Sequence, residues 1–234
     1  YLEPSLFYQV DCLSRTKQQI VKCVETNCSL SKAFQFQEPE VNLTEEIVGI
    51  VALLATVNDD RLSRVFAEYL TESYMLAVVF KSYKSASSLE KFTKDGKVSR
   101  NCAIHKIVSQ VGAKVDKRFT AIFLDEIRPY LDVLEESGHE RKLALQDPCL
   151  PSGKMPHGFL GHAVNMINLD MRHVHIKTSS GYGLRETLFY RLFGELQVYQ
   201  TREDIEHAKG CIKSGAVSLD GQIMRDHGII CLGD

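Results

Sequence analysis

The last third of this chain repeats the plan of its first half. One glycine-led apolar run begins at Gly49, and a second begins at Gly161. Each run leads into an amphipathic stretch, then a short strand rich in β-branched residues at 77–80 or 196–199, and then a polar stretch that can form another helix. Residue identity between the halves is low, so the repeat rests on pattern and order. It predicts two similar halves with pseudo-twofold symmetry.

Composition narrows the class of protein. Apolar residues make up 44% of the 234 residues, which is enough to build the core of one large domain or two small ones. No apolar run approaches the roughly 20 residues that a membrane helix needs, and no charged-then-apolar leader opens the chain. We therefore expect a soluble globular protein that does not act at a membrane. Because the chain begins at Tyr1, we also expect it to be a fragment of a longer protein.

Cysteine and histidine give no clear metal signal. The seven cysteines are an odd set without a C-x-x-C pair, which favours reduced thiols in the cytosol or nucleus over disulfides or a zinc site. His173 and His175 alternate as ligands on a strand would, and His162 lies nearby in the sequence. Since no Cys or carboxylate stands at a ligand-like spacing beside them, ordinary surface histidines are the favoured interpretation. The sequence predicts neither a metal nor a cofactor.

The first 38 residues differ from the rest. Their apolar side chains recur at alternating spacings of four and three, the a/d pattern of a coiled coil, with Lys17 as an interruption. About three heptads fit a single helix packed on the domain equally well, so both interpretations stay open. Pro39 ends this element because it biases the preceding residue to extended geometry.

Helices and short strands alternate in the first half. The apolar run 47–57 predicts a helix capped at Asn42 or Thr44. Residues 61–70 have helical apolar spacing. Two buried strands are predicted, at residues 75–80 and 121–124. This alternation is typical of an α/β domain.

The second half follows a polar joint at 131–154 that ends in clustered prolines. A second glycine-led helix and a helix at 184–194 are expected next. Three strands should close the chain, at residues 216–219, 222–225 and 229–232. The Asp-Gly pair at 220–221 between two of them is a strong hairpin signal.

Four motifs carry a family resemblance. They are the segments 158–167, 183–190, 196–199 and 215–221. In this order they resemble the hinge of structural maintenance of chromosomes (SMC) proteins, and most of all a divergent plant branch. That branch contains a factor of RNA-directed DNA methylation and larger flexible-hinge-domain proteins induced by DNA damage. The likeness runs from about Thr44 to Gly233.

The resemblance implies an α/β (α+β) SMC hinge with two pseudo-symmetric half-hinges and an N-terminal coiled-coil segment. The expected divisions are 1–40 for the hinge-proximal helix, 41–130 for the first half-hinge, 131–157 for the linker and 158–234 for the second half-hinge. Such hinges form dimers through sheet edges and glycine-rich turns. By motif match, the residues expected at the partner chain are Gly181, Tyr182, Gly183, Leu184 and Gly194. Where ordinary hinges carry a glycine pair near their end, this chain has only Gly233.

Charge is distributed unevenly along the chain. Residues 81–118 contain ten Lys or Arg and only three acidic residues, although the whole chain has a net charge of −2. Such an excess can follow a phosphate backbone, and hinges of this family are known for nucleic-acid binding. The expected DNA or RNA contacts are Lys91, Lys94, Lys97, Arg100, Lys106, Lys114, Lys117 and Arg118. The alternative is that the acidic stretch 125–147 neutralises them on one surface.

Catalytic motifs are weak. The loop 180–183, Ser-Gly-Tyr-Gly, precedes a helix and could form an anion-binding loop, but Glu186 occupies the third glycine position of a dinucleotide motif. No G-x-S-x-G hydrolase elbow occurs. An acid/base set drawn from Asp170, Asp220, Asp226, His173 and His227 is explained more simply by turns and surface residues. We therefore predict that the chain is not an enzyme.

Three functions remain, in order of preference. The first is a homodimerisation module of a nuclear, SMC-like chromatin protein that binds nucleic acid without sequence preference, works with other chromatin proteins and acts in DNA repair or recombination. The second is a scaffold hinge of RNA-directed DNA methylation and gene silencing that does not bind DNA itself. The third is a small α/β enzyme that uses the loop 180–183. No segment resembles an ATPase head.

Overall fold

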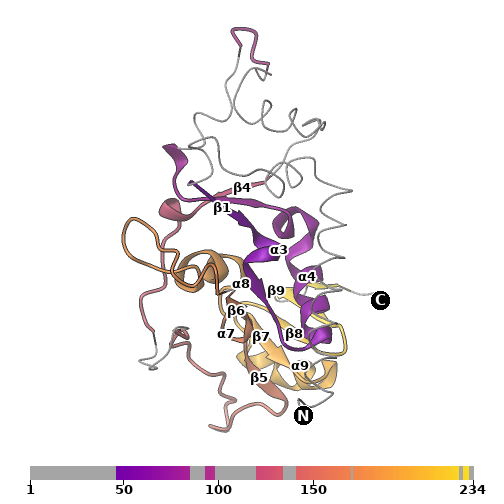
Figure 1. Cartoon of the computed structure of the whole chain (residues 1–234). Coiled ribbons are helices and arrows are strands. Elements are labelled where there is room, and N and C mark those ends of the chain that lie inside the picture. The colour runs from indigo at the N-terminus through magenta and orange to yellow at the C-terminus, as the bar shows by residue number, and fades with distance from the viewer. Residues whose placement is uncertain are drawn as a thin grey trace, which may run out of the picture. The chain divides into compact units, whose positions relative to one another are not determined.

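The computed structural model describes residues 46–84, 93–97, 120–133, 141–169, 171–226 and 229–231. The expected coiled-coil segment 1–40 lies outside these residues. The described residues divide into two compact units, one within the bounds 1–53 and 76–123 and the other within 54–75 and 124–234. Residues 60–75, drawn as the long helix α4 in Figure 1, therefore belong to the second unit. The division into half-hinges stays a prediction.

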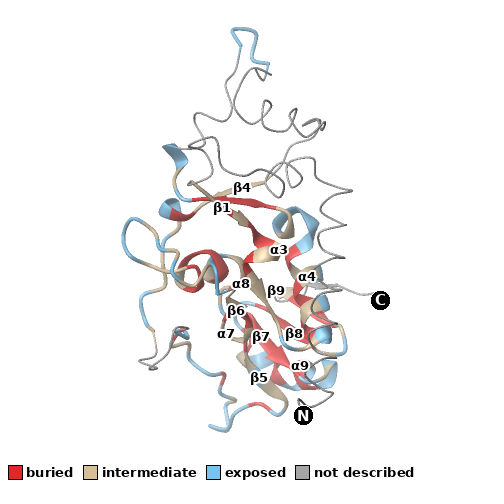
Figure 2. Ribbon diagram, in the orientation of Figure 1, coloured by how far each residue is buried: buried red, intermediate tan, exposed pale blue. Residues whose placement is uncertain are grey.

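The first unit contains a three-stranded sheet in the order β1-β3-β4. The strands are β1 (Ile47–Ile50), β3 (Val78–Phe80) and β4 (Ala121–Phe123). β1 runs antiparallel to β3, and β4 runs parallel to it. β3 is buried along its whole length, as Figure 2 shows in red, which confirms the predicted central strand. β4 confirms the strand expected at 121–124.

The helix predicted over 47–57 is wrong. Residues 47–50 form β1, and only the single turn α3 (Val51–Leu54) is helical. The same correction holds for the second run, where β5 (Phe159–His162) precedes the single turn α7 (Ala163–Met166). A short continuous apolar run does not distinguish a strand from a helix by its periodicity. Gly49 and Gly161, with φ of 146° and 140°, place a bend in each strand that a helix could not contain.

The second unit contains a five-stranded sheet in the order β10-β9-β8-β7-β5. Its other strands are β7 (Gln197–Tyr199), β8 (Ala216–Ser218), β9 (Ile223–Asp226) and β10 (Ile229–Cys231). β7 and β8 are parallel, and all other neighbours are antiparallel. The Gly221 N–H donates to the Ser218 carbonyl over 3.0 Å, which confirms the hairpin at the Asp-Gly pair. A separate pair joins β2 (Ala55–Thr56) to β6 (Asn168–Leu169).

The repeat is confirmed at the level of strand register. In the first unit, Ile47, Gly49 and Ile50 pair with Phe80, Val79 and Val78. In the second, Phe159, Gly161 and His162 pair with Tyr199, Val198 and Gln197. Both ladders shift register at the glycine. Each residue of β5 therefore has its counterpart in β1, 112 positions earlier in the chain. His162, for example, matches Ile50.

Helices cover the second sheet. α4 (Asp60–Met75) includes the amphipathic stretch 61–70, and its Phe66 packs on Phe193 with ring centres 4.9 Å apart. The helix predicted at 184–194 is present as η2 (Arg185–Phe189), a π-helical turn, continued by α8 (Tyr190–Phe193). The remaining helical segments are η1 (Leu124–Glu126), α9 (Arg202–Ala208) and η3 (Lys209–Cys211). None of the described helices has both the length and the apolar character to cross a membrane.

Two arginines, one buried and one half-buried, hold helical segments in the second unit. Arg185 is 2% exposed and donates to the carbonyls of Val164 (2.6 Å) and Ile167 (3.0 Å). These carbonyls lie at the end of α7, where a cation is favourable. From β9, Arg225 donates to the Tyr69 carbonyl of α4 over 2.5 Å and lies 4.8 Å from the centre of the Tyr69 ring. Arg185 therefore joins η2 to the end of α7, and Arg225 joins β9 to α4.

Candidate functional site

The outer edge of β4 is the most informative feature of the first unit. The Val78 N–H donates to the Thr120 carbonyl over 3.0 Å, just as the Gln197 N–H donates to the Gly215 carbonyl over 3.2 Å in the second unit. The match identifies β4 as the counterpart of β8. Because backbone groups alternate along a strand, Thr120 and Ile122 face β3, while the N–H and C=O groups of Ala121 and Phe123 face away from it.

The two counterparts differ on their outer sides. β8 is paired there with β9, and the Ser218 N–H donates to the Gln222 carbonyl over 3.0 Å. Beside β4, the described part of the first unit contains no strand. The three β4 residues are accordingly half-buried, whereas the three β8 residues are buried. An apolar strand edge that no described strand covers is a template for strand addition.

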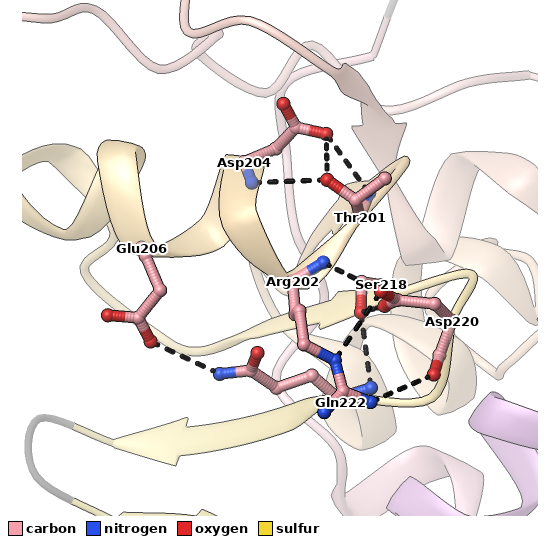
Figure 3. Close-up of polar contacts among 7 residues, drawn as sticks. All are labelled: Thr201, Arg202, Asp204, Glu206, Ser218, Asp220 and Gln222. Atoms are coloured by element: carbon pink, nitrogen blue, oxygen red, sulfur yellow. Dashed lines mark hydrogen bonds and ion pairs between the residues drawn. The ribbon is translucent and has the colours of Figure 1, made fainter.

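β10 is one of the two edge strands of the second sheet, and a polar cluster lies at the β8–β9 turn that precedes it (Figure 3). The Ser218 hydroxyl donates to Asp220 and accepts from the Gln222 N–H over 3.1 Å. Asp220 also accepts from the Arg202 N–H over 3.1 Å, so the turn is joined to the start of α9. Burial acts to raise the pKa of Asp220, but the Ser218 and Arg202 contacts outweigh it, and the pKa is lowered.

The start of α9 carries a capping box. The Thr201 hydroxyl accepts from the Asp204 N–H (3.3 Å), and the Asp204 carboxylate accepts from the Thr201 N–H (3.0 Å). His157 Nδ1 lies 2.7 Å from the same carboxylate. The hydrogen bonds from His157 and then Thr201 lower the pKa of Asp204. Further along α9, the Glu206 carboxylate accepts a hydrogen bond over 3.5 Å from the side-chain amide of Gln222, the residue before β9 (Figure 3). This network fixes the hairpin that leads to β10.

The predicted interface glycines lie in a tight loop. Gly181, with φ of 87°, is exposed, and its N–H donates to the Thr178 carbonyl over 2.9 Å. Gly183 forms an isolated antiparallel bridge with Lys177, and a Cβ at this position would meet the Glu186 carboxylate at 2.8 Å. Tyr182 is half-buried beside them. The structure therefore brings these three residues together on one loop.

The other two predicted interface residues have clear roles inside their own chain. Leu184 is 1% exposed, so its side chain has almost no area left for a partner. Gly194 ends α8 with φ of 56°, and its N–H donates to the Tyr190 carbonyl over 2.7 Å. A positive φ is a backbone conformation that glycine adopts without a steric cost, which favours glycine at this helix end. Their assignment to an interface stays a prediction.

The loop 180–183 is poorly suited to hold an anion. The Ser179 N–H already donates to the Asp125 carboxylate over 2.8 Å, and the Tyr182 N–H donates to the Thr178 hydroxyl over 3.1 Å. Glu186 adds a second negative charge in the first helical turn. An incoming phosphate would meet two carboxylates and lose these donors. The geometry weakens the enzyme hypothesis, which the sequence had already disfavoured.

Of the eight predicted nucleic-acid contacts, only Lys94 and Lys97 lie in the described residues. Both are exposed on a tight turn in which the Thr93 N–H donates to the Lys97 carbonyl over 2.8 Å. Within this described turn, neither lysine side chain forms an ion pair that would compete with a phosphate. The remaining predicted contacts fall outside the described residues: Lys91, Arg100, Lys106, Lys114, Lys117 and Arg118.

The histidine and acid/base candidates do not gather into a site. His162 is 4% exposed, and burial lowers its pKa. His173 and His175 lie in a turn at 171–175, and Asp220 belongs to the hairpin turn described above. Among the described residues, His, Cys, Asp and Glu nowhere form a group of three that could hold a metal ion. Asp170 and His227 lie outside the described residues, as does the side chain of Asp226.

The comparisons with known proteins give one extensive sequence match. No protein-family model matches the chain. The chain is 39% identical, in an alignment of 233 residues that covers 95% of this chain, to "Structural maintenance of chromosomes flexible hinge domain-containing protein GMI1" of Arabidopsis thaliana. It spans 14% of the length of that relative.

Solved hinge domains are also similar to the chain. The SMC hinge domain of Geobacillus stearothermophilus, solved as an asymmetric dimer, is 14% identical with a TM-score of 0.47, over 97% of this chain and 80% of that one. The hinge domain of the Pyrococcus furiosus SMC protein is 15% identical with a TM-score of 0.44, over 88% of this chain and 85% of that one. The fold is mixed α/β, and the sequence similarity covers 95% of the chain. The chain is therefore identified as a segment similar to SMC flexible hinge domain-containing proteins.

Proposed function

We propose that the chain is a homodimerisation module in which two copies pair through their sheet edges. The observation that supports this proposal is the outer side of β4, which no described strand covers, in the place that β9 occupies beside β8 in the second unit. A strand from a second copy, for which β10 is the candidate, would pair with the outward groups of Ala121 and Phe123. In a closed twofold dimer, each β4 edge would pair once with the β10 edge of the other copy, so neither of these two edges would stay exposed.

The glycine loop is the second element of the proposed interface. Gly181, Tyr182 and Gly183 support it because they form an exposed or half-buried turn whose backbone a partner can approach closely. Leu184 and Gly194 would contribute through backbone rather than side chain, since Leu184 is buried in its own chain.

Nucleic-acid binding is the second proposed activity. It rests on the basic excess of residues 81–118 and on the exposed turn that carries Lys94 and Lys97. Contacts to phosphates do not depend on base sequence, so binding would be general and would weaken steeply with salt.

In the longer parent protein, the module would act in the nucleus with other chromatin proteins. DNA repair or recombination is the preferred role, and a scaffold for RNA-directed DNA methylation and silencing is the alternative. The name of the Arabidopsis relative supports a chromosomal setting. Expressing the parent protein in Arabidopsis that lacks this relative distinguishes the roles. Restored survival after irradiation supports repair, and restored DNA methylation alone supports silencing.

Pairing through β4 is tested by Ala121→Pro. Proline at the first residue of an edge strand removes an outward N–H without breaking a bond to β3. The variant should keep its circular dichroism spectrum and dissociate to monomer at protein concentrations where the unmodified chain is dimeric. A variant that dimerises as well as the unmodified chain would exclude β4 as the pairing edge.

Nucleic-acid binding is tested by the double variant Lys94→Glu and Lys97→Glu. A matched control is Lys154→Glu with Lys213→Glu, which changes two exposed lysines of the second unit and gives the same net charge. The first variant should lose DNA affinity at moderate salt, and the control should not. Equal losses in both would mean that only net charge matters and would exclude the basic turn as a site.

A further inference from the structure

An exposed tyrosine stands between two lysines where the central strand of the first unit ends. β3 is buried up to Phe80, and Lys81, Tyr83 and Lys84 are exposed after it. The Lys81 N–H donates to the Glu46 carbonyl over 2.9 Å, which fixes the backbone two residues before the tyrosine. Tyr83 keeps 59% of its surface exposed.

The Tyr83 ring is held by other aromatic rings. It meets Phe123 of β4 nearly edge-on, with ring centres 5.3 Å apart and planes at 85°. Phe123 in turn stacks on the buried Phe80, with centres 5.7 Å apart. A ring supported in this way loses little freedom when a ligand binds, which favours stacking. The described structure thus contains a preorganised aromatic surface.

The segment that carries this ring is basic in sequence. Residues 73–89 contain two lysines, Lys81 and Lys84, and no Asp or Glu. An exposed ring flanked by cations matches a planar heteroaromatic base attached to an anionic backbone. Bases in a duplex are covered by their neighbours, whereas an unpaired base offers its face.

We propose that Tyr83 is a stacking contact for an unpaired base of single-stranded nucleic acid, with Lys81 bound to the adjoining phosphate. This rests on the proposed nucleic-acid binding and adds a site and a strand preference to it. The basic turn binds phosphates of any nucleic acid, whereas Tyr83 distinguishes single strands from duplex.

The chain has no tryptophan, so Tyr83→Trp introduces a single indole fluorophore. A 20-nucleotide poly-dT strand should quench its emission, because a stacked base quenches an indole, and a duplex of the same length should quench it far less. Tyr74→Trp on α4 is the matched control, since Tyr74 is 49% exposed and has no neighbouring lysine. Its emission should not change with either ligand.

Affinity gives the second readout. Tyr83→Leu keeps apolar contact with Phe123 but removes the π face, and it should weaken poly-dT binding by about tenfold. Duplex affinity should stay within about twofold. Tyr83→Phe should bind as the unmodified chain does. Unchanged poly-dT affinity in Tyr83→Leu, with Lys94→Glu and Lys97→Glu still weakening it, overturns the stacking contact alone. Absence of any binding by the unmodified chain overturns both this inference and the proposed nucleic-acid function.

Discussion

Gly49 and Gly161 occupy the same position in two strands that pair in the same way. Each lies at a register shift in an antiparallel ladder and has a φ near 140° that other residues avoid. The N–H two residues further on also makes the same bond, from Val51 to Ala77 (3.1 Å) and from Ala163 to Leu196 (2.9 Å). The two halves thus share a bend that turns each edge strand into a single helical turn.

Replacing the second of these glycines should cost stability. In Gly161→Ala, the new Cβ would lie 3.8 Å from the Met166 sulfur, an ordinary contact, so the cost comes from the backbone conformation. We expect a loss of about 1–3 kcal/mol, measured by urea unfolding. Gly210→Ala is the control, because no atom lies within 4 Å of its Cβ and its φ is not positive. An equal loss in both variants would contradict this account of the bend.

Replacing Thr71 by glycine should instead raise the stability of the fold. Thr71 has φ of 66° and ψ of 161°, a conformation that belongs almost wholly to glycine, and it interrupts α4. Thr71→Gly should therefore raise the free energy of unfolding by about 1 kcal/mol. Glu72→Gly, one residue further, removes a side chain from a helical position and should lower it. Thermal melting of both variants checks the pair, and a destabilised Thr71→Gly would show that Thr71 is not strained.

The capping box should make the second unit sensitive to acid. The pKa of Asp204 is lowered in the folded chain, so its ionised form stabilises the fold above the ordinary aspartate value of about 3.9. As the pH falls through the folded pKa, this contribution is lost. Asp204→Asn should cost about 0.5–2 kcal/mol at pH 7. The difference between the variant and the unmodified chain should shrink below pH 4, and a constant difference down to pH 2.5 would refute the assignment.

His162 should make the stability of the fold depend on pH in a higher range than Asp204 does. Burial lowers the folded pKa of His162, although Asp147 and Glu195 oppose this. As the pH falls below about 6.5, the unfolded chain takes up a proton that buried His162 resists, so stability falls. His162→Ile introduces the residue found at the matching position, Ile50, and should remove that loss. Unfolding free energies at pH 7.5 and 5.5 measure it, and an equal loss in the variant would assign the effect to another group.

The sequence predicts this fold unevenly, for physical reasons. The hairpin at 220–221 and the strands around Val79 and Val198 were predictable, because turn chemistry and β-branched runs are local signals. The apolar run that contains Gly49 predicts a helix instead of the strand that forms, since such a run has no period that excludes a helix. Buried Arg185 gave no signal, because a basic residue usually lies outside.

The candidate edge was harder to predict than the strand that forms it. Residues 121–124 predict a strand, but only the pairing pattern shows that no strand among the described residues covers the outer side of β4 as β9 covers β8. The glycine motif of 181–183 was visible in the sequence, yet the Asp125 carboxylate that occupies the Ser179 N–H comes from 54 residues earlier. Contacts between such distant segments depend on the folded chain.

Dimerisation is the central claim, and light scattering across a concentration series tests it most directly. The account predicts a mass of twice the 26.4 kDa of one chain, stable from high to low micromolar concentration. A mass of one chain at every concentration would contradict the proposal that these copies pair through their own sheet edges.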